Sequence, residues 1–199
     1  AGVRDYHDKK LMEPRGIPSD ITYTTLRHYA DKVIPDDEYK ARVERGLRPA
    51  TSIWPWGEGK KAILPEFEKT RGIKGAVVSA VDLLKGIAVG AGMKNIEVEG
   101  ANGGLHTNYE GKANAAIKTL LEDGNDFVYV HVEAPDECGH RNEIDNKVKA
   151  ISIIDKTILG PVTDYLRSQG DFKVLVTPDH ATPLSLMTHT NDPIPFFIY

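Results

Sequence analysis

Cysteine occurs once, as Cys138, so the chain cannot form an internal disulfide, and a lone thiol is compatible with a reducing cytoplasm. No stretch approaches the roughly 20 apolar residues of a membrane span, and no apolar secretory region opens the chain. Neither sign of charge dominates. The 25 basic and 29 acidic residues give a net charge of −4, which argues against nucleic-acid and anionic-membrane partners. We therefore expect a cytoplasmic globular protein.

The length of the chain suits one domain, or one domain and part of another. It has 199 residues, and an apolar content of 40% suffices for a packed core. An apolar run over 194–199 closes the sequence, although chain ends are usually exposed and polar. This ending favours a piece of a longer protein. We divide the chain into residues 1–62 and 63–199, because the sequence pattern changes between them.

The first part has only short predicted elements, because prolines interrupt it. Capping residues and glycines predict helices over 19–32 and 36–45, and a proline-broken strand covers 52–56. From Pro65 onward, strands and helices alternate, which is typical of an α/β fold with a mostly parallel sheet covered by helices on both faces. The predicted strands are 75–79, 95–98, 126–132, 173–177 and 196–198, and the predicted helices are 65–71, 82–90, 108–122 and a long one whose apolar face carries Ile144, Val148, Ile151, Ile154 and Ile158.

Asp136 and His140 lie four residues apart in HVEAPDECGH, directly after the strand predicted over 126–132. On a helical turn this spacing places both side chains on one face. A carboxylate and an imidazole suit Zn²⁺ or Mn²⁺ better than an all-oxygen Mg²⁺ or Ca²⁺ site. Taken alone, however, such a pair is more often a polar turn that caps the next helix.

Two more polar groups follow, in VLVTPDHATP and MTHTNDP. Asp179 and His180 come after the strand predicted over 173–177, where an open α/β sheet binds its ligands. Alone, they are equally consistent with a helix cap, and His189 alone would be a surface histidine. Considered jointly, these residues predict that carboxylates and imidazoles distant in sequence gather at one rim of the sheet to bind divalent ions.

In this order, the segments resemble a known family. VYVHVEAPDECGH, VLVTPDHATP and THTNDPIPFFIY, with the upstream SIWPWGEGK, GAVVSAVDLLKGIAVGAGM and GANGGLHTNYEGK, are similar to the archaeal-type cofactor-independent phosphoglycerate mutases. These enzymes belong to the alkaline phosphatase superfamily. The resemblance covers about residues 48–199, and the combined pattern is highly specific.

The resemblance implies an alkaline phosphatase-like core that binds two divalent ions, which could be Mn²⁺, Zn²⁺ or Mg²⁺. Asp136, His140 and His189 would hold one ion. Asp179 and His180 would hold the second. In the family, the second ion also takes an N-terminal aspartate and the serine nucleophile, and this sequence has no recognisable setting for either. The chain therefore resembles a C-terminal fragment, which we expect to be inactive alone.

By the same resemblance, residues 1–62 would be the end of an inserted substrate-binding domain, and residues 63–199 the C-terminal part of the metal-binding domain. The implied reaction is the glycolytic isomerisation of 2- and 3-phosphoglycerate. A hydroxyl takes the phosphoryl group, as phosphoserine, and returns it to another carbon. The alternatives are a homoserine kinase-like enzyme or another phosphoryl-transfer member of the superfamily, a non-catalytic metal-binding fragment, and a purely structural module.

Lysines are the candidates for contacts with a small phosphorylated substrate. Lys85 aligns with a family lysine that neutralises phosphoryl charge, with a solvated helix lysine as the alternative. Lys60 and Lys61 follow a Gly-x-Gly loop and would bind a carboxylate or phosphate, or else be solvated. Trp56 stands where archaeal relatives tend to have an arginine, which weakens the case for carboxylate recognition.

Polar residues around the predicted ligands have less distinct roles. His131 and Glu133 flank a strand end, where one could orient a ligand, although a satisfied core histidine is the more common outcome. Lys112 resembles a family signature position, and its helix favours a structural role. Cys138 lies between two predicted ligands, where the family has a small residue, and we assign it to packing.

Overall fold

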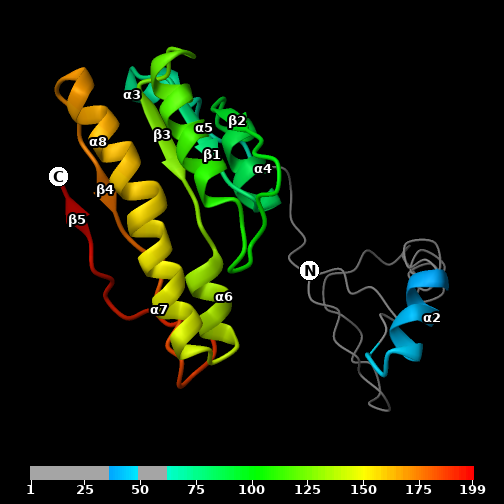
Figure 1. Cartoon of the computed structure of the whole chain (residues 1–199). Coiled ribbons are helices and arrows are strands. Elements are labelled where there is room, and N and C mark those ends of the chain that lie inside the picture. Colours follow the sequence, from blue (N-terminus) through cyan, green and yellow to red (C-terminus); the bar gives the residue numbers. More distant parts are fainter. Residues whose placement is uncertain (1–35, 49–61) are drawn as a thin grey trace. The chain divides into compact units, whose positions relative to one another are not determined.

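The computed structural model describes residues 36–48 and 62–199 (Figure 1). The chain divides into two units between Lys61 and Ala62, and each unit is considered by itself. Within the two described stretches, every helix is too short or too polar to cross a membrane.

In the first unit the described structure is one helix, α2 (Asp36–Glu44). Gly46 follows it with a φ of 66°, the left-handed conformation in which many helices end. The helix predicted over 36–45, with its glycine stop, is therefore confirmed. The elements predicted over 19–32 and 52–56 lie outside the described residues.

The centre of the second unit is a parallel sheet with the strand order β2-β1-β3. Its strands are β1 (Gly75–Val78), β2 (Lys94–Ile96) and β3 (Phe127–Val130). Helix α4 (Asp82–Gly90) connects β1 to β2, and α5 (Tyr109–Leu121) connects β2 to β3. The chain runs from the central strand β1 to the edge strand β2, and then crosses to β3 at the other edge. Because both connections are right-handed, they place α4 and α5 on opposite faces of the sheet. This arrangement confirms the α/β fold class.

The core is built between α5 and the chain that follows β3. Its buried cluster consists of Tyr109, Ala113, Ala134, Ala150 and Ile158, and the three small alanines let the helices approach closely. At the far end of the sheet, α3 (Phe67–Arg71) places the ring of Phe67 against that of Phe127, with 5.5 Å between the centroids. Gly72 ends α3 with a left-handed φ, as predicted.

After β3 the chain forms α6 (Ala134–His140) and α7 (Ile144–Ile153). A π-helical stretch, η1 (Ile154–Leu159), then leads directly into α8 (Gly160–Gln169). Figure 1 shows α7 and α8 in line as one long rod beside the sheet. The predicted long helix therefore exists, with a change of winding before Gly160.

The apolar face predicted for this long helix was wrong over its first half. Ile144, Val148 and Ile151 are each more than half exposed, and the core side of α7 carries Ala150 and Ile153 instead. A π-helix has wider turns than an α-helix, so a period of 3.6 residues does not continue through η1. Only the later members of the predicted face, Ile154 and Ile158, belong to the core.

Two short strands, β4 (Leu175–Val176) and β5 (Phe197–Ile198), form a separate antiparallel pair. Leu175 pairs with Ile198, and Val176 with Phe197. Both strands lie within ranges that the sequence predicts, but they do not join the parallel sheet. The expectation that these strands add to one mostly parallel sheet is corrected by this pairing.

Candidate metal centre

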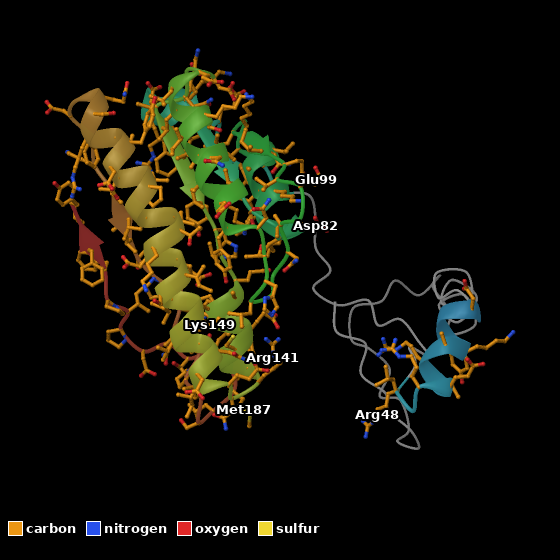
Figure 2. All side chains as sticks on the ribbon, in the orientation of Figure 1. Arg48, Asp82, Glu99, Arg141, Lys149 and Met187 are labelled. Atoms are coloured by element: carbon orange, nitrogen blue, oxygen red, sulfur yellow. The ribbon has the colours of Figure 1, made fainter. Side chains whose placement is uncertain are left out.

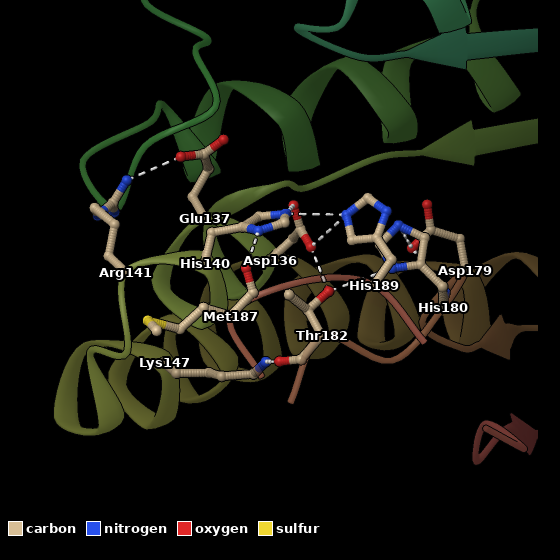
Figure 3. A network of polar contacts seen from close by, with 10 residues as sticks. All are labelled: Asp136, Glu137, His140, Arg141, Lys147, Asp179, His180, Thr182, Met187 and His189. Atoms are coloured by element: carbon tan, nitrogen blue, oxygen red, sulfur yellow. Dashed lines mark hydrogen bonds and ion pairs between the residues drawn. The ribbon is translucent and has the colours of Figure 1, made fainter. Parts of the chain in front are cut away.

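Helix α6 supplies a carboxylate and an imidazole on the same face. Ala134, Cys138 and Gly139 are buried, so α6 packs along one side, and Asp136 and His140 lie on the other. The Nε2 atom of His140 lies 3.3 Å from Oδ2 of Asp136. Figure 3 shows the two side chains pointing toward the loop that follows β4.

That loop brings two further imidazoles to α6. The N–H of Thr190 donates to the carbonyl of Ala181 at 3.0 Å, which forms an isolated antiparallel bridge. The bridge holds His180 and His189 together, with 3.8 Å between their ring centroids. The Nε2 atom of His189 also lies 3.3 Å from Oδ1 of Asp136.

The candidate ligand atoms are separated by distances that suit an ion. Nε2 of His140 lies 3.0 Å from Nε2 of His189, and each of these nitrogens lies 3.3 Å from an oxygen of Asp136. Atoms bound about 2.1 Å from an ion are about 3.4 Å apart in a tetrahedron and about 3.0 Å apart in an octahedron. His180 extends the cluster, because ligand atoms of Asp136, His180 and His189 all lie within 4.8 Å of one another. The residues present therefore fit a divalent ion.

A backbone carbonyl sets the tautomer of His140. Nδ1 of His140 lies 2.9 Å from the carbonyl oxygen of Met187. Because a carbonyl can only accept, Nδ1 carries the proton, and Nε2 presents a lone pair toward Asp136 and His189. Met187 has a φ of 53°, which is uncommon for a residue other than glycine. In Figure 2 it lies at the end of the unit where α6 and α7 meet.

Two residues near the candidate ligands were missed by sequence reasoning. The hydroxyl of Thr182 donates to Oδ1 of Asp136 and lies 3.3 Å from Nδ1 of His180. Lys147, from α7, donates to the backbone carbonyl of Thr182 at 2.7 Å. The only sequence signal for Thr182 is its position two residues after His180, and Lys147 has none.

Asp179 is directed toward its own neighbour. Its Oδ1 accepts the backbone N–H of His180 at 3.1 Å and lies 3.6 Å from Nε2 of that histidine. The ring of His180 lies next to that of His189, tilted by 33°, and His180 belongs to the same group as Asp136. The ligands assigned from the sequence to two different ions thus lie in one continuous cluster, and their division between two ions stays a prediction.

Of the candidate substrate-binding lysines, only Lys85 lies within the described residues. Lys85 lies in the first turn of α4, and its Nζ contacts Glu97 at 3.0 Å and Asp82 at 3.7 Å. The hydrogen bond that Lys85 donates to Glu97 raises the pKa of Lys85, and it lowers the pKa of Glu97. The role of Lys85 toward a phosphoryl group stays a prediction. Lys60 and Lys61 lie outside the described residues.

Buried and half-buried polar groups surround the end of β3. Nδ1 of His131 lies 3.4 Å from the hydroxyl of Ser79, and the Nζ of Lys112 donates to the carbonyl of His131 at 2.7 Å. Burial lowers the pKa of both His131 and Lys112, and it raises the pKa of Glu133. Cys138 is fully buried, and burial raises the pKa of its thiol. The burial of Cys138 supports its assigned packing role, and the bond from Lys112 to His131 supports the structural role assigned to Lys112.

Comparisons with known proteins agree with a metal centre. A family model described as the metalloenzyme superfamily matches residues 10–199. The chain is 54% identical over 159 residues to a 2,3-bisphosphoglycerate-independent phosphoglycerate mutase of Methanosarcina mazei. The aligned region covers 79% of this chain and 40% of the relative. It is 42% identical over 186 residues to the protein of that name from Methanothrix thermoacetophila, which covers 93% and 47%.

A solved structure has a similar fold. The PH0037 protein from Pyrococcus horikoshii matches with a TM-score of 0.66 and 32% sequence identity. The match covers 82% of this chain and 42% of that protein. The chain thus spans less than half the length of these relatives.

Proposed function

Because this chain belongs to the metalloenzyme superfamily, we propose that it forms part of a cofactor-independent phosphoglycerate mutase, an isomerase that interconverts 2- and 3-phosphoglycerate. The names of the relatives and the motif segments support this proposal. The substrate is then a small phosphorylated acid, and the reaction belongs to glycolysis in the cytoplasm. Residues 1–62 are proposed to end a substrate-binding domain, and residues 63–199 to belong to the metal-binding domain.

The cluster of carboxylate and imidazole groups is the observation that carries this proposal. Asp136 lies 3.3 Å from both His140 and His189, and the ring centroids of His180 and His189 are 3.8 Å apart. We assign Asp136, His140 and His189 to one divalent ion, and His180 with Asp179 to a second. The imidazole nitrogens favour Mn²⁺ or Zn²⁺ over Mg²⁺.

When bound, such ions lower the pKa of a nucleophilic hydroxyl and neutralise the phosphoryl oxygens. The residues of this chain hold and orient that positive charge. The carbonyl of Met187 keeps Nε2 of His140 free to bind an ion. Lys85 would add a further positive charge by exchanging Glu97 for a phosphoryl oxygen.

The test uses the whole protein that contains this chain. With Mn²⁺ and without 2,3-bisphosphoglycerate, it should convert 3-phosphoglycerate to 2-phosphoglycerate, which enolase turns into phosphoenolpyruvate for an absorbance readout. His140→Ala and His189→Ala should each lower kcat/KM by at least about 100-fold, because stabilisation of several kcal/mol is lost. His106→Ala, which removes an exposed histidine, should leave kcat/KM unchanged.

The other outcomes separate the alternatives. Turnover of homoserine with ATP, without turnover of phosphoglycerate, would replace the mutase by a kinase. Mn²⁺ binding without either reaction would favour a non-catalytic metal-binding protein. Wild-type activity in both His140→Ala and His189→Ala would remove the metal centre from the reaction.

A further inference from the structure

A threonine hydroxyl lies between two of the predicted metal ligands. Thr182 donates to Oδ1 of Asp136, its Oγ1 lies 3.3 Å from Nδ1 of His180, and only 5% of the residue is exposed. We propose that Thr182 is a positioning residue of the metal centre, whose hydroxyl fixes the orientation of Asp136 and the tautomer of His180. This inference rests on the metal centre proposed above.

The direction of each hydrogen bond follows from the donors available. An ionised carboxylate can only accept, so the single hydroxyl proton of Thr182 points to Asp136. The contact with His180 therefore requires that its Nδ1 carries a proton and donates to Oγ1 of Thr182. In the neutral imidazole, Nε2 of His180 then has a free lone pair, which is the form that binds a metal ion.

Thr182 is held against α6 and α7 by contacts of its backbone carbonyl. Lys147 donates to its backbone carbonyl at 2.7 Å. A Cβ atom added to Gly139 would lie 2.7 Å from the same carbonyl, so α6 and Thr182 are in close contact. The hydroxyl is thereby placed beside Asp136 before any ion arrives, and pre-placed partners of this kind orient metal ligands.

The position of the hydroxyl also connects the two proposed ligand sets. Asp136 is assigned to one ion and His180 to the other, and Thr182 contacts both. Its removal frees the Asp136 carboxylate to rotate and lets His180 adopt the tautomer with the proton on Nε2. Loss of such a hydrogen-bonding partner weakens metal affinity by about 10- to 100-fold.

The metal-binding test uses the metal-free 199-residue chain in calorimetric titrations with Mn²⁺. Thr182→Val should weaken Mn²⁺ binding by about 10- to 100-fold, and Thr182→Ser, which keeps the hydroxyl, should bind like the wild type. Thr163→Val is the matched control, because that hydroxyl bonds within the helix, to the carbonyl of Leu159. The control should leave binding unchanged.

A second measurement needs no metal. In the metal-free chain at a pH where imidazoles are neutral, long-range proton–nitrogen NMR spectra distinguish the two tautomers of each histidine. His180 should carry its proton on Nδ1 in the wild type and in Thr182→Ser, and lose this preference in Thr182→Val. Should Thr182→Val fail to fold, Thr182→Ala compared with Thr182→Ser isolates the hydroxyl in the same way.

Each contrary result has one meaning. Wild-type Mn²⁺ affinity in a folded Thr182→Val, or an unchanged tautomer of His180, would overturn the positioning role and leave the metal centre standing. A similar loss of affinity in Thr163→Val would also overturn it, because the effect would then be general. Absence of Mn²⁺ binding to the folded wild-type chain would remove the proposed centre, and the role of Thr182 with it.

Discussion

Lys112 is the bulkiest of the fully buried side chains in the described stretches, with 1% of the residue exposed. Its Nζ donates to the carbonyl of His131, at the point where β3 gives way to α6. Burial lowers the pKa of Lys112, and the charge of Glu133 opposes this change. The lysine therefore connects α5 to the segment that leads to Asp136. Its hydrogen bond goes to the backbone of that segment and not to a candidate metal ligand.

Truncating Lys112 tests this tie. Lys112→Ala should lower the free energy of unfolding by about 2–5 kcal/mol, because it leaves a cavity and an unsatisfied carbonyl. Lys118→Ala is the control, because Lys118 is exposed on the same helix, and it should change the free energy by less than about 0.5 kcal/mol. Urea unfolding followed by circular dichroism measures both. Equal effects of the two substitutions would show that the buried contact adds no stability.

Glu133 should make stability depend on pH. Burial raises its pKa above the ordinary 4.5, so the native state keeps this proton to a higher pH than the unfolded chain. Its contribution to stability is therefore complete below pH 4.5 and is lost as pH rises through the native pKa. Glu133→Gln removes this loss, so the variant should gain stability relative to the wild type between about pH 4 and pH 7. Urea unfolding at both pH values measures the gain, and an equal difference at both would contradict the assignment.

At the scale of residues, the sequence indicated which side chains are candidate ligands better than it indicated which residues contact them. Asp136 and His140 are close because helical spacing makes them so, and spacing can be read directly. The position of His189 next to Asp136 depends on a bridge between residues 181 and 190. A single backbone hydrogen bond of this kind produces no recognisable motif in the sequence. The carbonyl of Met187 could belong to any residue type, so its role toward His140 was beyond sequence reasoning.

At the scale of elements, local signals located most helices and failed where distant contacts decide. The helix predicted from residue 82 to about residue 90 is confirmed, and Asp82 and the glycines near its end mark its limits. The face of α7 was assigned wrongly, because alternative apolar stripes lie on both sides of it and only the tertiary packing selects one. The antiparallel pairing of β4 with β5 joins strands too far apart in sequence for a turn signal to indicate it.

Helix α6 provides a test of close packing between elements. Alanine in place of glycine usually stabilises a helix interior by about 1 kcal/mol. At Gly139, however, the added Cβ would lie 2.7 Å from the carbonyl of Thr182 and 2.9 Å from Nζ of Lys147. Gly139→Ala should therefore destabilise the chain by about 1–3 kcal/mol, because a backbone carbonyl cannot move aside cheaply.

Gly86→Ala is the matched control for this substitution. Gly86 also lies inside a helix, α4, and a Cβ added there meets nothing within 4 Å. It should raise the free energy of unfolding by about 0.5–1 kcal/mol. Thermal and urea unfolding of both variants give the comparison, and stabilisation by Gly139→Ala would mean that α6 and residue 182 are not in close contact.

At the scale of the whole second unit, the candidate centre lies between two regions whose strands belong to separate sheets. Asp136 and His140 belong to α6, which follows the parallel sheet, whereas His180 and His189 belong to the chain that follows β4. The β4–β5 pair is not hydrogen-bonded to that sheet. An ion held by both groups would therefore cross-link the two regions and favour the folded state.

This cross-link predicts that metal binding stabilises the chain by mass action. An ion at about 100 times its Kd should raise the free energy of unfolding by about 2.7 kcal/mol, and each further tenfold of ion should add about 1.4 kcal/mol. His189→Ala should largely abolish the rise in melting temperature with Mn²⁺, because it removes the nitrogen next to both His140 and Asp136. His106→Ala removes an exposed histidine and should keep the rise. Thermal unfolding across a Mn²⁺ series, with a chelator as the zero point, measures all three proteins. A rise of the same size in His189→Ala would place the bound ion away from His189 and contradict its assignment as a ligand.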